Sequence, residues 1–248
     1  MFTNLPKNFN LLDIYDQSYF SGGQDDGYVN YIASEKILRL EFKKTVALIR
    51  QFTKYEQGLR LLEIGSAYGF FLDEARDFFS CAGIEVSEEG VLFSRNRGHQ
   101  VIHGVADEDT LSSLGHFDVI VMLDVIEHLP SPRETIRLLK SHLRNDGILL
   151  IVTGDVSSML ARITGKFWRL MTPPQHTYFF SGETLSKLLK DLGFKVEYVN
   201  RPWKFVPLNL ALYQLTARMG LNFSWLNKFN SIGFNVNLFD TIRIIARK

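Results

Sequence analysis

Short apolar runs alternate with segments of helical character along most of the chain, and this alternation restricts the possible folds more than any other feature of the sequence. An amphipathic segment at 34–49 precedes the first run. Strands that alternate with helices predict an α/β fold with a doubly wound parallel sheet, because right-handed crossovers place helices on both faces. Ligands of such sheets bind beyond the carboxyl ends of the strands. The predicted strands occupy 59–64, 81–86, 100–103, 117–123 and 148–153.

The last quarter of the chain adds two predicted strands, at 195–199 and 241–246. We expect a seven-stranded sheet that is mostly parallel, with an antiparallel last strand. Too many residues separate these two strands for a tight hairpin, and their apolar content predicts a helical cap insertion. The predicted organisation is a loop-rich lead-in or lid at 1–35, a ligand-binding domain at 36–200, the cap at 201–240 and the final strand at 241–248.

Charge and cysteine content exclude several classes of protein. The 28 basic and 27 acidic side chains give a formal net charge of +1 without a long run of either sign, which argues against a nucleic-acid-binding surface. Cys81 is the single cysteine, so one chain can form neither a disulfide nor a cysteine-based zinc site. With no signal peptide or membrane-spanning segment evident, we expect a cytoplasmic protein.

The most informative motif runs from Glu63 to Gly69, where the first strand should pass into a helix. Glycine lets the backbone approach a ligand closely, and a helix N-terminus adds amide donors. A dinucleotide site would need G-x-G-x-x-G, but Ala67 and Phe70 stand at the second and third glycine positions. A carboxylate at Glu63 instead suits a cofactor that carries a positive sulfonium and an amino group.

Glu85 follows Gly65 by twenty residues and ends the second predicted strand. A carboxylate there can accept hydrogen bonds from both hydroxyls of a ribose. The alternative is that the glycines are ordinary turn residues and that both carboxylates are solvated charges at strand ends. The presence of a carboxylate at the end of each of two successive predicted strands, at Glu63 and Glu85, favours the ligand-binding interpretation.

At this point the sequence resembles the class I S-adenosylmethionine-dependent methyltransferases, which have a Rossmann-like fold. The resemblance covers residues 36–200 and comprises LLEIGSAYG, GIEVS, FDVIVMLDVIEHLPSP and LLKSHLRNDGILLIVT, in that order. The EHLP segment and PPQHTYFFSGETLSKLLKDLGF are similar to a bacterial group of small-molecule methyltransferases related to ubiquinone-pathway and sugar-modifying enzymes. The resemblance implies S-adenosylmethionine as cofactor and S-adenosylhomocysteine as its product.

The resemblance also implies a role for individual cofactor-binding residues. The loop after the first strand would surround the methionine part, Glu85 would hold the ribose, Val86 and the 105–107 loop would flank the adenine, and residues 124 and 125 would line the far wall. Two departures are evident, because Ala67 replaces a common glycine and Val105 stands where an acidic residue is frequent. The implied residues are Glu63, Gly65, Ser66, Ala67, Gly69, Glu85, Val86, Val105, Ala106, Asp107, Asp124 and Val125.

Two histidines are candidate general bases for methyl transfer to an oxygen. His176 lies where the chain should cross the pocket after the fifth strand, and a role in removing a proton and a role in fixing a proline-stiffened loop have equal weight. For His128, after the fourth strand, a structural hydrogen bond is the favoured interpretation. The other histidines show no metal-ligand spacing, so we predict no metal.

Aromatic residues are the candidates for contact with the acceptor, although most aromatic side chains in these regions should serve the core. We assign to this role Tyr19, Tyr28, Tyr178 and Trp203. The expected function is methyl transfer to a small-molecule acceptor, favoured at a hydroxyl oxygen of a metabolite or saccharide. The alternative is a cofactor-binding sensor or partner subunit without catalysis. The sequence leaves open the acceptor, transfer to carbon or nitrogen, and whether the protein is a monomer or a dimer.

Overall fold

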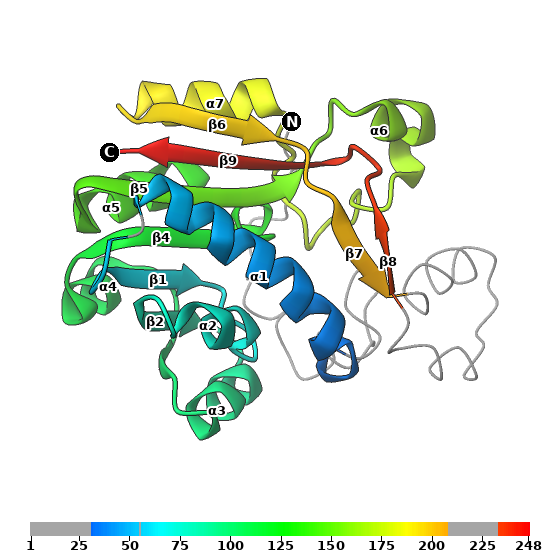
Figure 1. The fold of residues 1–248 in the computed structure, drawn as a ribbon. Helices are drawn as coiled ribbons and strands as arrows, with labels where there is room; N and C mark the ends of the chain where they lie inside the picture. Colours follow the sequence, from blue (N-terminus) through cyan, green and yellow to red (C-terminus); the bar gives the residue numbers. More distant parts are fainter. Residues whose placement is uncertain (1–30, 55, 208–232) are drawn as a thin grey trace.

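A computed structural model describes residues 31–54, 56–207 and 233–248 (Figure 1). The helices are α1 (Glu35–Phe52), α2 (Phe70–Ala75), α3 (Glu88–Asn96), α4 (Glu108–Leu114), α5 (Pro132–His142), α6 (Met159–Thr164) and α7 (Gly182–Asp191). The strands are β1 (Arg60–Ile64), β2 (Ser80–Glu85), β3 (Gln100–His103), β4 (Phe117–Leu123), β5 (Leu143–Gly154), β6 (Lys195–Asn200), β7 (Lys204–Pro207), β8 (Gly233–Val236) and β9 (Thr241–Arg247).

Seven of these strands form one sheet in the order β3-β2-β1-β4-β5-β9-β6. The pairs from β3 to β5 are parallel, whereas β9 lies antiparallel to both β5 and β6. This arrangement confirms the predicted seven-stranded, mostly parallel sheet with an antiparallel last strand. The strand order reverses direction between β1 and β4, where ligands of doubly wound sheets bind.

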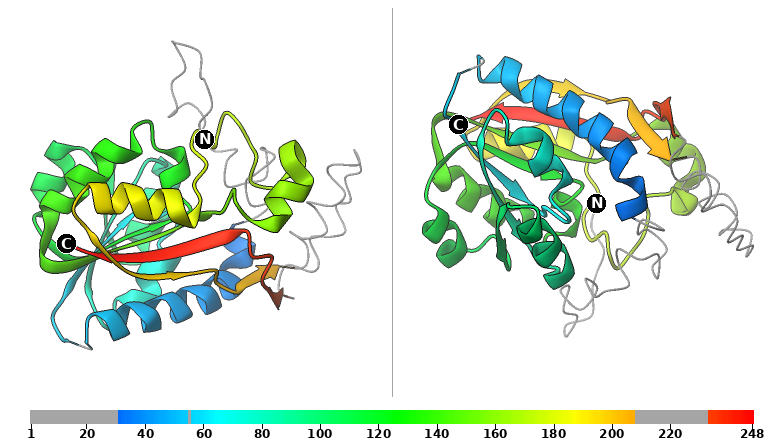
Figure 2. Two further views of the ribbon diagram at one scale, coloured as in Figure 1. Left: turned by 90° about the horizontal axis from the view of Figure 1, so that it is seen from above. Right: turned by 60° about the horizontal axis from the view of Figure 1, so that its bottom comes forward.

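The sheet is buried on both faces because successive residues of its central strands point into two different cores. In β4, Ile120 and Met122 belong to a core that α4, α5 and α7 cover, whereas Val119 and Val121 belong to a core that α1, α2 and α3 cover. Figure 2 shows α1 on one side of the sheet and α7 on the other. Burial on both faces explains why these strands are continuously apolar in the sequence.

Helix α1 follows the amphipathic pattern predicted for 34–49. Ile37, Leu38, Val46 and Ile49 are buried, and charged residues occupy the other side. Helix α4 was not predicted, because its seven residues contain two serines and a threonine and bury only Leu111 and Leu114. Short polar segments of this kind carry little helical periodicity.

The insertion between β6 and β9 begins and ends differently from the prediction. The cap at 201–240 was expected to be helical, but its two ends form an antiparallel pair, β7 with β8. The two ends of the insertion can pair because antiparallel β6 and β9 are neighbours, so that β6 ends where β9 begins (Figure 1). Residues 208–232 and most of the lead-in at 1–35 lie outside the described part of the chain.

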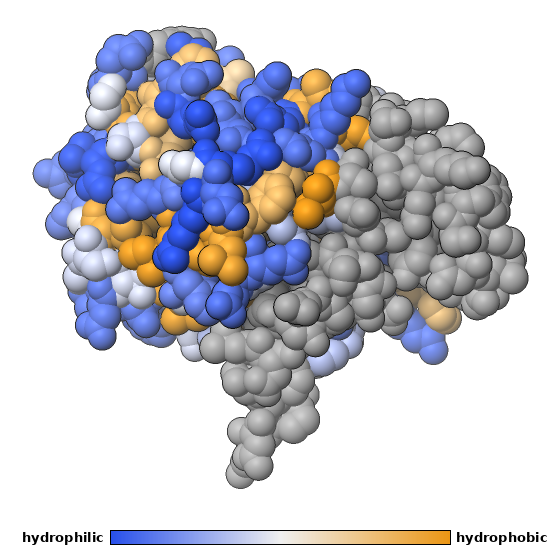
Figure 3. Space-filling model, turned by 90° about the horizontal axis from the view of Figure 1, so that it is seen from below, coloured by the Kyte–Doolittle hydropathy of each residue, from blue (hydrophilic) through white to orange (hydrophobic). Residues whose placement is uncertain are grey.

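The surface seen in Figure 3 mixes hydrophilic residues with small hydrophobic areas, as is usual for folded domains. Among the described residues, no helix combines the length and the hydropathy needed to cross a bilayer.

Candidate functional site

A tight bend between β1 and α2 forms the centre of the candidate site. Gly65 and Gly69 have φ angles of +72° and +75°, a region that suits glycine. A Cβ on Gly65 would lie 2.6 Å from Val125 Cγ2, so the bend packs directly against the residue that follows β4. The predicted residues Gly65, Gly69 and Val125 are thereby brought together at the point where the strand order reverses.

Ala67 stands in the middle of this bend with a φ of +44°. Its N–H donates to Glu85 Oε2 at 2.6 Å, and its carbonyl accepts from Ser94 Oγ at 3.0 Å. These two contacts hold a conformation that L-residues rarely adopt. The alanine noted as a departure from the family pattern therefore still forms the left-handed turn that a glycine would form.

Glu63 and Glu85 lie at the ends of neighbouring strands and share one buried region. Glu63 is 3% exposed and Glu85 is 4% exposed. Because Glu63 pairs in register with Gly83, two residues before Glu85, the two carboxylates belong to the same face of the sheet. Burial raises the pKa of Glu63 well above its ordinary value, and the nearby charge of Glu85 raises it further.

The two carboxylates differ in their hydrogen bonds. Glu85 accepts from the N–H groups of Ala67 and Ser87, yet burial still raises its pKa. Glu63 Oε2 and Ser66 Oγ, both buried, have no hydrogen-bond partner in the part of the chain that the structure describes. A buried carboxylate oxygen without a donor is costly, so these atoms fit a ligand that brings N–H donors and a positive charge. This is the chemistry of the S-adenosylmethionine that the sequence implied.

The residues predicted to flank an adenine lie beyond the ends of β2 and β3. Val86 and Ala106 are half-buried, whereas Val105 and Asp107 are exposed. Asp107 is the N-cap of α4 and accepts from the Thr110 N–H at 2.8 Å, and this bond lowers the pKa of its carboxyl group. Its observed role is helix capping, and its contact with an adenine stays a prediction.

Asp124 and Val125, predicted to form the opposite wall, follow directly after β4. Asp124 is exposed and has a φ of +53°, and its N–H donates to the Val152 carbonyl at the end of β5. The unusual backbone angle turns the chain at the carboxyl end of the sheet, where strain commonly accompanies function. Val125 lies against the glycine bend, and the contact of both residues with a cofactor stays a prediction.

His128 and His176 meet face to edge, with ring centroids 4.6 Å apart, and both are buried. His128 Nδ1 lies 3.0 Å from the Gln175 carbonyl, and His176 Nδ1 lies 2.8 Å from the Leu170 carbonyl. Since a carbonyl only accepts hydrogen bonds, each Nδ1 carries a proton, and the neutral form of each ring has its lone pair on Nε2. Burial and the neighbouring His176 lower the pKa of His128 to about 3.

Glu127 completes a buried group with the two histidines, and one ligand atom from each lies within 4.8 Å of the others. Sequence reasoning did not identify this group, because the third member lies 48 residues after His128. The ligands of a divalent ion lie closer together, roughly 3–3.5 Å apart for metal bonds of about 2.1 Å. The prediction of no metal stays untested, and chelation tests it directly.

The candidate acceptor residues are distributed more widely. The Tyr178 hydroxyl donates to the Pro130 carbonyl at 3.3 Å, and the Tyr178 ring stacks on Phe180, so it ties the EHLP loop to the segment before α7. Trp203 is 56% exposed at the edge of a separate cavity. Tyr19 and Tyr28 lie outside the described residues.

Two glycines that support the bend were missed in the sequence. A Cβ on Gly83 would lie 2.7 Å from Ser66 Oγ, and a Cβ on Gly90 would lie 2.9 Å from the Ala67 carbonyl oxygen. Both positions need glycine so that β2 and α3 can approach the loop. The signal was present, since Gly83 and Gly90 flank Glu85, but only the packing shows which glycines are confined.

Comparison with known proteins assigns the fold to a family. A family model described as a methyltransferase domain matches residues 33–199. The chain is 27% identical over 128 residues to a ubiquinone biosynthesis O-methyltransferase of Caulobacter sp. (strain K31), an alignment that covers 48% of this chain and 51% of that protein. A protein of the same name from Xanthomonas axonopodis pv. citri is 27% identical over 164 residues, covering 59% of this chain and 69% of that protein. The chain therefore spans about half of the first relative's length.

Solved structures show the same fold at low identity. A methyltransferase from Archaeoglobus fulgidus superposes with a TM-score of 0.57 at 21% identity, covering 84% of this chain and 94% of that one. Magnesium protoporphyrin IX methyltransferase from Synechocystis PCC 6803, solved with bound S-adenosylhomocysteine, gives 0.59 at 17% identity, covering 95% and 99%. At these identities the likeness concerns the fold alone.

Proposed function

This chain belongs to the class I S-adenosylmethionine-dependent methyltransferases, and from that premise we propose that it transfers the methyl group to a hydroxyl oxygen of a small-molecule acceptor. The observation that carries the proposal is the buried pair Glu63 and Glu85 on either side of the glycine bend. In this family S-adenosylmethionine supplies a methyl group bound to a positively charged sulfur. The chain's own contribution is to bind, orient and accept a proton.

The proposed binding roles follow from the hydrogen bonds that each group still lacks. Glu85 already accepts two backbone N–H groups, which fix its carboxylate in position, and its remaining lone pairs suit the two hydroxyls of a ribose. Glu63 Oε2 has no such partner in the described residues, and its desolvated carboxylate suits the amino group and the positive sulfur. We assign Val125, which packs against Gly65, and the adjacent Asp124 to the wall on the far side of the bend.

The proposed proton acceptor is His176. Methyl transfer is an in-line displacement, so much of the rate should come from positioning, while a hydroxyl acceptor also loses a proton. Because His176 Nδ1 donates to the Leu170 carbonyl, the neutral ring has its lone pair on Nε2, the atom that would take the proton. A pKa of about 3 makes His128 a weak base, so we assign it a role in fixing the position of His176.

The proposal of an oxygen acceptor draws on the curated relatives, which are named ubiquinone biosynthesis O-methyltransferases. The near balance of 28 basic and 27 acidic side chains supports a small molecule over a nucleic acid. The single cysteine is consistent with a cytoplasmic protein, which we include in the proposal. We further propose that the segments 1–35 and 201–240 act as lid and cap over the acceptor, with Tyr19, Tyr28, Tyr178 and Trp203 in contact with it.

Calorimetric titration with S-adenosylhomocysteine tests the cofactor half of the proposal. Glu85→Ala should weaken binding by roughly 10–100-fold, since each hydrogen bond to a charged group contributes about 1.5–3 kcal/mol. Glu88→Gln, an exposed carboxylate three residues away, is the matched control and should bind like the wild type. Wild-type protein that does not bind, or Glu85→Ala that binds equally well, contradicts the proposal.

Transfer of a radiolabelled methyl group into cell-extract metabolites tests the catalytic half. The wild type should label a small molecule, and His176→Gln should lower the rate more than it lowers cofactor affinity. Chelation with EDTA should leave activity intact if the Glu127 group holds no metal. Tight cofactor binding with no transfer to any fraction would favour the sensor or partner-subunit alternative.

A further inference from the structure

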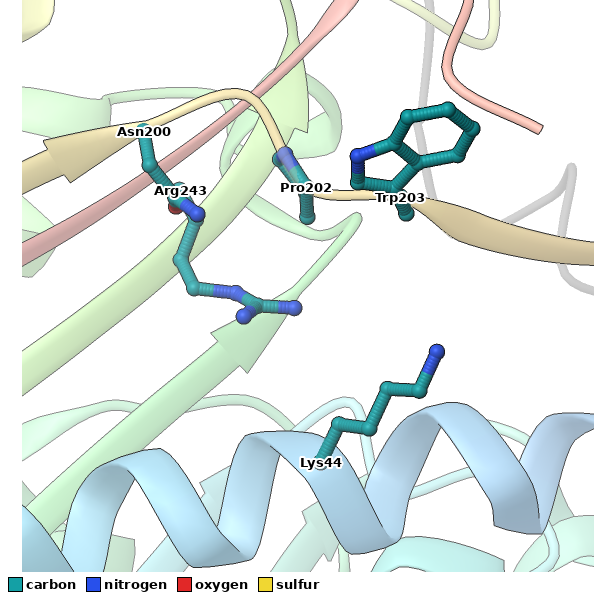
Figure 4. A pocket seen from close by; sticks show the side chains of 5 residues that line it. All are labelled: Lys44, Asn200, Pro202, Trp203 and Arg243. Atoms are coloured by element: carbon teal, nitrogen blue, oxygen red, sulfur yellow. The ribbon is translucent and has the colours of Figure 1, made fainter. Parts of the chain in front are cut away.

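A cavity of about 330 Å³ lies at β9, outside the glycine bend. It is open to solvent and lies between α1, the end of β6 and the start of β9. Its described lining consists of Lys44, Asn200, Pro202, Trp203 and Arg243 (Figure 4). In that view the side chains of Lys44 and Arg243 extend toward the same space from α1 and from β9.

Arg243 is the unusual member of this lining. It is 6% exposed, and within the described residues its Nε has no hydrogen-bond partner and its Nη2 donates to Thr45 Oγ1, at 3.3 Å. Burial lowers the pKa of Arg243, but arginine stays protonated in proteins. A buried positive charge without a bound carboxylate destabilises a fold, so its presence needs another explanation.

Three neighbouring arginines differ from Arg243 because each forms an ion pair with a carboxylate. Arg169 binds Asp240, Arg201 binds Asp155, and Arg247 binds Glu197, each through short charge-assisted hydrogen bonds. Arg243 is more buried than any of these three, yet no carboxylate of the described chain forms an ion pair with it. The Glu41 and Asp124 charges act on it only from a distance.

Asn200 adds a second unsatisfied atom to the same cavity. Its Oδ1 is buried and accepts no hydrogen bond within the described part of the chain. Arg243 and Asn200 pair in register on β9 and β6, so the two groups face one space. Together they offer donors for an anion and an acceptor for a hydroxyl, beside the apolar surfaces of Pro202 and Trp203.

The cavity is one strand removed from the cofactor wall. Arg243 pairs with Val152 of β5, and the Val152 carbonyl accepts from the N–H of Asp124. The charge of Asp124 also influences the guanidinium of Arg243. A molecule that spans these two positions would have one end beside Asp124 and the other against Arg243.

We propose that Arg243 and Lys44 bind an anionic group, a carboxylate or a phosphate, of the methyl acceptor. This inference rests on the function proposed above. The planar guanidinium binds either oxyanion through two parallel hydrogen bonds, and Lys44 adds charge at the mouth of the cavity. Trp203 and Pro202 then pack against the apolar body next to that group. The acceptor class is a hydroxylated carboxylic acid or a hydroxylated phosphate ester.

Thermal unfolding of the full chain with saturating S-adenosylhomocysteine tests this subsite. The probes are inorganic phosphate and benzoate, each compared with chloride at equal ionic strength. At least one probe should raise the midpoint of wild-type thermal unfolding by 2 °C or more. The probe with the larger shift shows whether the subsite prefers a phosphate or a carboxylate. Arg243→Met should abolish the shift, Lys44→Gln should reduce it, and Lys43→Gln, an exposed neighbour on α1, should leave it unchanged.

Arg243→Met should not destabilise the protein in chloride, because it removes a buried charge that lacks an anionic partner and keeps the apolar stem. Should this variant fail to fold, Arg243→Lys keeps the charge, loses the planar fork, and should show a smaller shift. Equal shifts in the wild type and in the Arg243 variants, or no shift with either probe, would overturn the inference. Cofactor titration of each variant separates this result from a failure of the proposed function, because loss of the subsite leaves cofactor affinity unchanged.

Discussion

Glu63 is a buried carboxylate, and its Oε2 receives no hydrogen bond from the residues that the structure describes. An ionised group in this position costs free energy until a ligand compensates it, and the raised pKa of Glu63 expresses that cost. Glu85 is also buried, but two backbone N–H groups offset part of the penalty. Backbone hydrogen bonds therefore fix the carboxylate of Glu85, whereas the buried charge of Glu63 is left without compensation among the described residues. This arrangement favours a cationic ligand.

Replacing Glu63 with glutamine should separate ligand binding from stability. Glu63→Gln keeps the shape and removes the charge, so the ligand-free protein should be at least as stable as the wild type. Affinity should fall more for S-adenosylmethionine than for S-adenosylhomocysteine, because only the former carries the positive sulfur. Calorimetry with both compounds measures the ratio, and unchanged affinity for both would show that Glu63 does not contact the cofactor.

His128 should make the protein sensitive to acid. Its folded-state pKa of about 3 lies below the ordinary value of 6.5, so between these values the unfolded chain binds the proton more readily. Its contribution to stability is present in full above pH 6.5 and is lost as the pH falls toward 3. Thermal midpoints measured from pH 7 to pH 4 should fall less steeply in His128→Asn, whose Nδ2 amide can donate to the Gln175 carbonyl in place of Nδ1.

The control for this experiment is His116→Asn, because the His116 ring is exposed. This variant should follow the wild-type curve. If His128→Asn also follows the wild-type curve, the acid sensitivity comes from other groups.

At the scale of elements, the bend between β1 and α2 depends on contacts from three other segments. Val125, in the segment after β4, and Gly83, in β2, pack against the bend. Helix α3 contacts it through Gly90 and Ser94. A bend confined in this way is preorganised, because the loop does not need to be ordered by the ligand. Changes in any of the three segments should therefore alter cofactor affinity.

Gly65→Ala should weaken S-adenosylhomocysteine binding at least tenfold. The new Cβ would lie 2.6 Å from Val125 Cγ2, and the φ of +72° adds strain of roughly 1–2 kcal/mol. Gly98→Ala is the matched control, because Gly98 has a φ of +86° with nothing within 4 Å of a new Cβ. It should lose stability but keep its affinity.

A second substitution tests the steric explanation for Gly65. Val125→Ala removes the clashing methyl group, so affinity in the Gly65→Ala background should recover in part. Calorimetry on the single and double variants gives the coupling between the two positions. Additive losses would mean that the Gly65–Val125 contact does not limit the bend.

The sequence predicted the elements that repeat a strong pattern and missed those that depend on distant partners. The central strands were evident because burial on both faces makes them uniformly apolar, and the Glu63 and Glu85 pair followed from their spacing along adjacent strands. The β7 and β8 pair escaped because its two halves are separated by residues 208–232. The Arg243 cavity escaped for the same reason, since Arg243 meets Thr45 across 198 positions of sequence.

On the scale of the whole molecule, the cofactor site joins segments from the first half of the described domain into one cooperative unit. Saturation with S-adenosylhomocysteine should therefore raise the midpoint of the entire unfolding transition. A hundredfold excess over Kd stabilises by about 2.7 kcal/mol, and a chain of this size gains roughly 2–4 °C for each kcal/mol. Differential scanning calorimetry should show one transition shifted by roughly 5–10 °C, whereas a second, unshifted transition would indicate a separate unit.

The reversed strand β9 and the β7–β8 pair also determine how freely this protein can change. The chain departs from the main sheet through β7 and comes back through the adjacent β8, so its exit and entrance are held side by side. Because β7 and β8 pair, a change in the length or sequence of the segment between them should leave the pairing of β6 with β9 intact. Under the function proposed above, changes in this segment should alter which molecule is methylated, while Glu63 and Glu85, on the distant strands β1 and β2, keep their positions.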